Sequence, residues 1–367
     1  MGPEPRVACR AVTAGPASGD GGVRAGAPAP APAGPASGDG GVRAGAPAPA
    51  PAGPAGTGRR GRAVRWLRAA LAAAALGFVV LALASRWEEV RGELGRVSPG
   101  ALLLAFALAC AALGTSLLGW RALLADLGSP LPLRPATRVL FLGQLAKYLP
   151  GSSVWAMVAQ TELARDFGVP RKRAAAAALV LNLVILGIGL QLALLALPAL
   201  LHSGAPGWLR WSPLLVPVGL ACLTPPLLTR LCNLALRVLR REPLDHPFSW
   251  RGLGPAVVAL TATWLLYGLH ATVLAVDLGA DPVDFFPLAT GAFAAAWCAG
   301  FLVVVVPTGA GTRELVLTLA LAGQLPGGTA AALTLAVVSR LLITVSDVAA
   351  AGLGVALGRP ARPSADR

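Results

Sequence analysis

Long apolar runs, separated by short polar connectors, make up most of the chain after residue 65. Most are near 20 residues or longer, and about 20 helical residues cross about 30 Å of hydrocarbon. The pattern predicts an all-α fold, that of a polytopic helical membrane protein with about 7–8 membrane segments. The expected long spans cover residues 66–85, 100–120, 173–200, 212–232, 254–278, 285–306 and 329–357.

Two proline-centred breaks interrupt the apolar pattern, at residues 137–161 and 307–325, and they echo each other. Each is followed by a second proline turn, an alanine run and a long apolar helix. Irregular backbone at membrane depth is tolerated only inside protein or beside a polar cavity, and a duplicated pair of broken segments points to a site between two related halves. The expected breaking residues are Pro150 and Gly151 in the first segment and Pro307, Gly309 and Gly311 in the second.

Composition supports a membrane protein and narrows its partners. The chain is 55% hydrophobic and 13% charged, about half the charge of an average soluble domain. Its formal net charge of +14 comes mostly from Arg residues that flank apolar runs. No basic face is interleaved with aromatic residues, so we expect no nucleic-acid partner. The five Cys show no ligand spacing, so neither a metal site nor a disulfide framework is expected.

Three regions are expected along the chain. Residues 1–58 form a low-complexity Ala/Gly/Pro-rich tail, in which a 19-residue block occurs twice without change, and this tail should be disordered. Residues 59–357 form the transmembrane domain. Residues 358–367 form a short polar tail.

Basic connectors orient the expected spans. Arg residues concentrate before the first span and in the connectors 121–138, 165–173 and 233–253, whereas 279–284 contains neither Lys nor Arg. The positive-inside rule therefore predicts a multi-pass protein of the cytoplasmic membrane with a cytoplasmic N-terminus. The first broken segment should enter and leave on the cytoplasmic side. The second is expected to span, which makes the C-terminus cytoplasmic; a re-entrant segment would place it outside.

Ionisable residues at membrane depth are the candidate substrate contacts, because such groups are rare and usually functional. Arg313 and Glu314 follow the second break near a helix start, where an anion such as a lipid phosphate could bind; otherwise they only hold the loop. Arg340 and Asp347 are two turns apart on one helix face, with structural pairing and substrate contact both open. We expect Arg313 or Glu314 to be partners of this pair.

Polar residues of the first half allow two interpretations. Lys147 and Gln144 either line the cytoplasmic mouth of a lipid path or belong to an interfacial amphipathic helix. Asn182 and Gln191 should make interhelical hydrogen bonds. His270 is either a satisfied packing residue or a proton relay.

The chain contains no hydrolase, kinase, nucleotide-binding or metal-binding motif and no soluble domain that could hold transfer chemistry. We therefore expect neither an enzyme nor a cofactor.

Two paired motifs stand out in the sequence: Leu149-Pro150-Gly151 with Phe167-Gly168-Val169-Pro170, and Pro307 to Glu314 with Arg340. They resemble those of the lysylphosphatidylglycerol synthase transmembrane family, a flippase-like integral membrane domain. The resemblance covers about residues 64–357. The sequence departs from the family pattern at Val154-Trp155, where members often carry Gly-Glu, and at Asn182, where they often carry Arg.

The resemblance implies translocation of a lipid or lipid-linked anion between leaflets, without ATP, by a stand-alone member lacking the aminoacyl-transferase domain. Lysylation is therefore not expected. The implied partners are membrane lipids with an anionic headgroup, and a homodimer stays open. The alternatives are a structural or regulatory subunit beside an envelope-lipid or glycan enzyme and, more weakly, a membrane transferase.

Overall fold

A computed structural model describes residues 87–148, 153–200, 207–238, 240, 242–302 and 311–357. Several sequence predictions fall outside these residues. They are the first span at 66–85, the tails 1–58 and 358–367, and the breaking residues Pro150, Gly151, Pro307 and Gly309.

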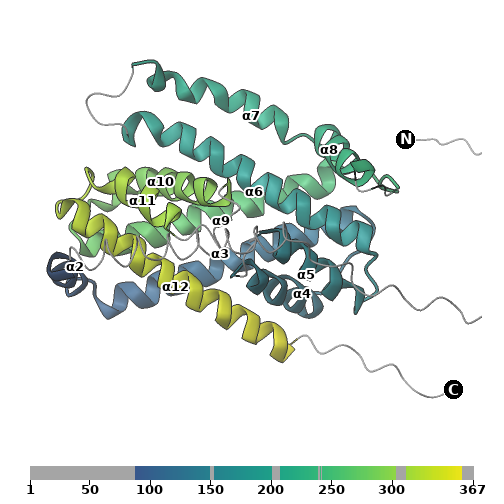
Figure 1. The fold of residues 1–367 in the computed structure, drawn as a ribbon, viewed down its shortest axis with the longest axis horizontal. Coiled ribbons are helices and arrows are strands. Elements are labelled where there is room, and N and C mark those ends of the chain that lie inside the picture. The colour runs from purple at the N-terminus through teal and green to yellow at the C-terminus, as the bar shows by residue number, and fades with distance from the viewer. Residues whose placement is uncertain are drawn as a thin grey trace, which may run out of the picture. The chain divides into compact units, whose positions relative to one another are not determined.

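Every regular element in the described part of the chain is a helix. Five helices are long and apolar enough to cross a membrane: α3, α6, α9, α10 and α12 (Figure 1). The predicted all-α polytopic membrane fold is confirmed. The α-helices are α2 (Trp87–Leu94), α3 (Pro99–Asp126), α4 (Leu133–Leu145), α5 (Ser153–Arg165), α6 (Arg171–Leu200), α7 (Val216–Cys222), α8 (Pro225–Val238), α9 (Trp250–Asp277), α10 (Pro282–Leu302), α11 (Thr312–Leu321) and α12 (Gly328–Leu357); the 3₁₀ helices are η1 (Ala146–Tyr148) and η2 (Gly207–Leu215).

The expected straight span at 212–232 is bent instead. Its two arms, Gly207–Cys222 and Pro225–Val238, meet at 69°, and they make a sixth span only if counted as one. The bend lies at two successive prolines, Pro225 and Pro226. Proline cannot donate a backbone hydrogen bond and disfavours helical geometry in the residue before it, so one helix ends and another begins there.

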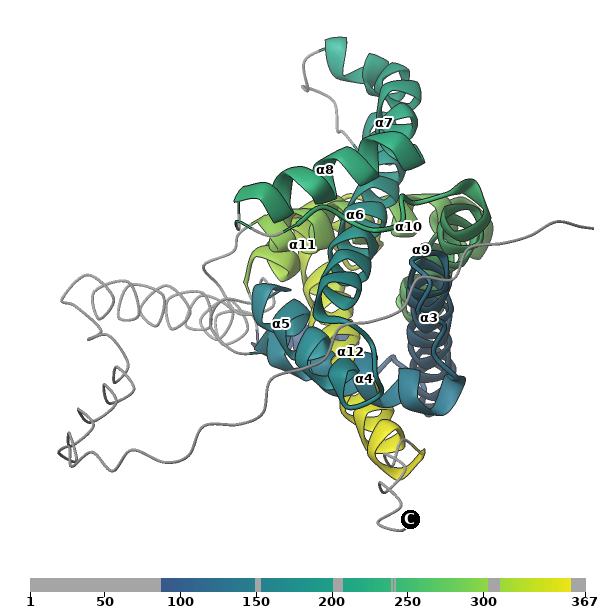
Figure 2. The same cartoon turned by 90° about the vertical axis from the view of Figure 1, so that its right-hand side faces the viewer.

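Helices α3 and α9 form an antiparallel pair whose ends are capped reciprocally. The Ser98 amide donates to Asp277 Oδ2 at 2.7 Å, and the Ser249 amide donates to Asp126 Oδ2 at 2.7 Å. Each helix thus ends in an aspartate that accepts a hydrogen bond from the start of the other, where negative charge is favourable. The two helices also lie side by side in Figure 2.

The packing reveals two related halves of opposite direction. The first half comprises α3–α6 and the second comprises α9–α12, each with a long helix, two shorter helices and another long helix. Helix α6 packs on α10, while α12 packs on α4. The antiparallel course of α3 and α9 makes this an inverted repeat, the arrangement in which transporters place substrate sites between halves.

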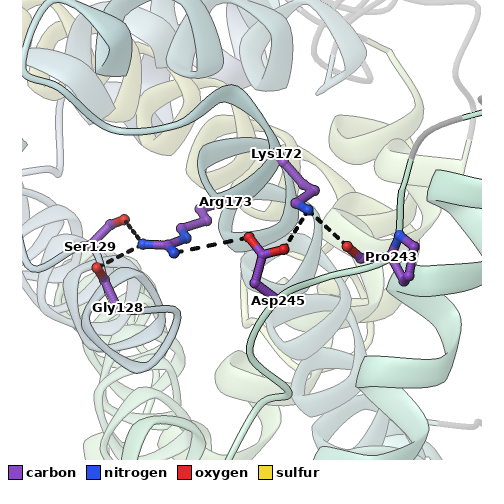
Figure 3. A network of polar contacts seen from close by, with 6 residues as sticks. All are labelled: Gly128, Ser129, Lys172, Arg173, Pro243 and Asp245. Atoms are coloured by element: carbon purple, nitrogen blue, oxygen red, sulfur yellow. Dashed lines mark hydrogen bonds and ion pairs between the residues drawn. The ribbon is translucent and has the colours of Figure 1, made fainter. Parts of the chain in front are cut away.

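Three connectors rich in basic residues meet at one end of the bundle, which we call the basic end. Arg173 donates to the Gly128 carbonyl at 2.9 Å and to Ser129 Oγ at 3.1 Å (Figure 3). Lys172 Nζ contacts Asp245 Oδ1 at 2.8 Å. The connectors predicted to share one side therefore lie together. That this side is cytoplasmic stays a prediction.

The first hairpin, comprising α4, η1 and α5, begins and ends at the basic end. The second hairpin, comprising α10 and α11, lies at the other end of the bundle (Figure 1). There Gln324 Nε2, just after α11, donates to the Ala199 carbonyl near the end of α6 at 3.3 Å. Helix α11 has 10 residues, about 15 Å of helix, which is half of the hydrocarbon thickness. Helix α11 alone is therefore too short to cross the hydrocarbon, whereas α10, with 21 residues, is long enough.

Helix α12 returns the chain to the basic end. A Cβ added at Gly354, in the last turn of α12, would lie 3.0 Å from Arg138 Cα in the second turn of α4. The described C-terminal end therefore lies at the basic end, on the side that the sequence predicts for the C-terminus and the basic connectors. That the second broken segment spans the membrane stays a prediction.

Candidate functional site

A polar cavity of about 110 Å³ lies between the two halves, where both hairpins meet. Its walls come from α3, η1 and α4–α6 in the first half and from α10–α12 in the second. Five of the six predicted contact residues line it, and the sixth, Glu314, lies immediately behind. The five are Gln144, Lys147, Arg313, Arg340 and Asp347.

Asp347 on α12 is the point at which the first hairpin is tied to the second half. Lys147 Nζ and the Tyr148 hydroxyl both contact its Oδ2 oxygen at 2.7 Å. The Asp347 side chain is 2% exposed and that of Lys147 is 25% exposed. The interfacial alternative for Lys147 is therefore wrong, because the ammonium is directed onto a buried carboxylate.

Glu314 uses its two carboxylate oxygens for two different tasks. Oε2 accepts a hydrogen bond from the Gly311 amide at 2.7 Å at the start of α11, and Oε1 lies 3.5 Å from Arg340 Nε. Gly311 has φ 83°, a conformation that favours glycine. Glu314 thus bonds the start of its own helix and pairs with Arg340, while its role as a substrate contact stays a prediction.

Arg313 reaches the cavity beside Arg340. Its guanidinium lies over the Phe293 ring, 5.6 Å from the centroid, and both arginines line the main cavity and a hollow of about 20 Å³ behind it. A ring face attracts a cation without neutralising it. Arg313 therefore keeps its charge available to the cavity.

The charges around the cavity leave a positive excess. Among the described residues, Lys147, Arg313 and Arg340 face Asp347, with Glu314 behind them, so three cations meet two carboxylates there. Buried charge is unfavourable unless it is compensated. An anion bound in the cavity would neutralise this positive excess.

Neutral polar groups of the first half line the cavity beside Lys147. Gln160, on α5, is 2% exposed, and its Oε1 has no hydrogen-bond partner among the described residues. Its backbone lies so close to Gly143 that a Cβ there would be 2.9 Å from the Gln160 amide nitrogen. An orphaned buried acceptor is rare in native structures and calls for a partner. A glycine inside an otherwise apolar helix was the available sequence signal for this close approach.

Two aromatic residues in the cavity wall were not anticipated. Trp297 and Phe301, one turn apart on α10, stack with their centroids 5.1 Å apart. Their spacing is equally typical of a lipid-facing helix surface, so the pattern alone could not assign them.

Other polar expectations have mixed outcomes. Asn182 lines the cavity but bonds the Ala178 carbonyl of its own helix at 2.8 Å, so the predicted interhelical bond is wrong. The Gln191 side chain packs tightly against Gly219 of α7, yet its buried Oε1 has no partner among the described residues. His270 is fully buried and bonds the Ala105 carbonyl and Ser339, as a satisfied packing residue does.

Comparison with known proteins agrees with the sequence resemblance. The sequence model described as the lysylphosphatidylglycerol synthase TM region matches residues 65–351. Among curated proteins, none matches this chain. Because the family match covers well over half of the 367 residues, this chain belongs to the lysylphosphatidylglycerol synthase transmembrane-region family.

Proposed function

We propose that this protein is a flippase-like carrier that moves an anionic phospholipid or a lipid-linked anion across the cytoplasmic membrane. One observation carries the proposal: three cationic side chains line a cavity between two inverted halves. Phosphate groups match guanidinium and ammonium donors in charge and geometry. Membership of a lipid-handling membrane family supports a lipid as the bearer of that anion.

Each candidate residue has a distinct role in this proposal. Arg313 and Arg340 hold the phosphate, with Arg340 kept in place by Glu314. Lys147 forms a releasable contact, because an incoming anion competes with Asp347 for its ammonium. Release would loosen the first hairpin from α12, and rocking of inverted halves around a fixed site is how alternating access is achieved. The process moves a lipid and makes or breaks no covalent bond.

The test is translocation of a labelled lipid in vesicles. The purified protein is reconstituted in vesicles containing fluorescent phosphatidylglycerol or phosphatidylcholine, and outer-leaflet label is quenched over time. Parallel vesicles carry an imposed proton gradient or membrane potential. We expect faster movement of phosphatidylglycerol than in empty vesicles, and a loss of about tenfold or more in Arg313→Gln, because a charge-assisted contact is removed.

Arg251→Gln is the matched control, since Arg251 is exposed at the basic end and does not line the cavity. It should transport as the wild type does. A folded Arg313→Gln variant that transports normally would contradict the proposed site. No movement of the anionic lipid under any gradient would instead favour the alternative of a structural or regulatory subunit.

A further inference from the structure

A second hollow, apolar and much larger than the polar cavity, opens between α3, α4 and α12. It encloses about 830 Å³, and we call it the first groove. Its walls include Phe106, Leu117, Leu118, Phe141, Leu353 and Leu357. In a membrane-spanning bundle an apolar hollow of this size fits lipid tails better than water, since water needs polar partners.

The inverted repeat provides an internal comparison for this groove. The equivalent hollow of the other half, between α9, α10 and α6, encloses about 470 Å³, and we call it the second groove. The first groove carries Arg134 in the first turn of α4, whereas the second carries Asp284 in the first turn of α10. The two grooves are thus lined by helices that are equivalent in the inverted repeat, but they carry opposite charges at equivalent positions.

Arg134 is available to a ligand. Its side chain is exposed at the basic end, and within the described residues its guanidinium has no ion pair or hydrogen bond. An arginine at the end of an apolar groove, at the level where α4 begins, matches a phospholipid whose tails lie in the groove and whose phosphate lies at the surface.

We propose that the first groove is a docking site for the acyl chains of an anionic phospholipid whose phosphate binds Arg134. The site is separate from the polar cavity, because it shares no lining residue with it. Lipid docking in the first groove requires no transport, so its test is independent of the flippase proposal. The second groove should show no preference for anionic lipid, since Asp284 repels a phosphate.

Gly114 gives a clean way to fill the groove. It lines the groove on α3, and a Cβ added there would meet nothing within 4 Å. Gly114→Phe should therefore occupy the lipid's place without disturbing the helices. Gly254→Phe is the matched control, since Gly254 on α9 is equally open but lines neither groove.

The measurement is native mass spectrometry of the protein extracted from bilayers of equal phosphatidylglycerol and phosphatidylcholine. The wild type and Gly254→Phe should retain a phosphatidylglycerol molecule that Gly114→Phe loses. Arg134→Gln should lower the preference for phosphatidylglycerol about fivefold, as expected for one basic residue near the headgroups. Arg138→Gln, on the same helix but outside the groove, should keep it.

Two outcomes would overturn the proposal. One is equal lipid retention by Gly114→Phe and Gly254→Phe at matched thermal stability. The other is an unchanged lipid preference in Arg134→Gln, which tests the headgroup contact without altering the core. If Gly114→Phe unfolds, Gly114→Leu replaces it, and unchanged lipid binding by that smaller variant also counts against the site.

Discussion

The first and second hairpins approach the same cavity from opposite ends of the bundle but differ in what holds them internally. Besides its ion pair from Lys147 to Asp347, the first hairpin is held by close packing of Gly143 against Gln160, and it offers neutral amides to the cavity as well as the Lys147 ammonium. The second relies on charge, with Glu314 binding both its own helix start and Arg340. An inverted repeat therefore conserves geometry while allowing its two halves to divide the chemistry of one site.

The largest expected effect on stability comes from removing the contact of Asp347 with Lys147 and Tyr148, which joins the two halves. Asp347→Leu leaves the Lys147 ammonium and the Tyr148 hydroxyl without their common acceptor. We expect a loss of about 2–3 kcal/mol in the free energy of unfolding, because a partly buried cation loses its partner. Chemical denaturation in detergent micelles measures this change.

The double variant Lys147→Met with Asp347→Leu is the control for that prediction. Removing both charges should recover most of the lost stability, since no uncompensated ion remains. A double variant as unstable as the sum of the single changes would show that the two residues act independently.

Close packing in the first hairpin gives the next largest effect. Gly143→Ala places a Cβ 2.5 Å from Gln160 Cγ and 3.0 Å from its Cα, so backbone must move. We expect a loss of about 1–3 kcal/mol in the free energy of unfolding. Gly114→Ala, where the Cβ has open space, should be neutral or stabilising. Equal behaviour of the two variants would mean that the first hairpin is not held by packing.

Gln160 separates stability from function in the same hairpin. Gln160→Leu removes a buried oxygen that lacks a partner, so stability should stay level or rise by about 1 kcal/mol. Lipid translocation in vesicles should nevertheless fall if that oxygen accepts a hydrogen bond from the headgroup. Normal translocation by a stable Gln160→Leu variant would assign the residue to packing alone.

The repeat could be predicted from the sequence, because the length of the apolar runs indicates membrane crossing and the paired prolines indicate broken helices. Arg313, Arg340, Asp347 and Lys147 could also be selected as candidates, because a charged side chain at membrane depth is energetically unfavourable and therefore rare. The partner that each charged side chain contacts could not be predicted. The Lys147–Asp347 contact joins residues 200 positions apart, and only the inverted packing of α12 on α4 brings them together.

Hydrogen bonds within a single helix, which compete with contacts between helices, explain contacts that the sequence did not predict. Asn182 satisfies its amide on its own helix, so a polar residue in an apolar run did not imply an interhelical bond. Glu314 stays a predicted substrate contact, and the bond to the start of its own helix was not predicted although Glu314 lies three residues after Gly311. The bend at Pro225 and Pro226 was visible in the sequence as a helix breaker inside the expected span.

The smallest expected effect lies at the basic end, far from the cavity. The hydrogen bond from Lys172 holds the pKa of Asp245 below its ordinary value of 3.8. A depressed carboxyl pKa adds stability above the unfolded-state value, and this contribution disappears as pH falls through the folded-state value. Asp245→Asn should therefore be slightly less stable than wild type at pH 7, and the difference should begin to shrink below about pH 4 and vanish once the pH is below the folded-state pKa. Asp245 is exposed, so the change at neutral pH should also shrink in high salt. Thermal unfolding across pH and salt measures both trends, and translocation should stay at the wild-type rate.

A large transport defect in Asp245→Asn would show that the basic end takes part in the transport cycle, and the division of chemistry between the two hairpins would then be incomplete.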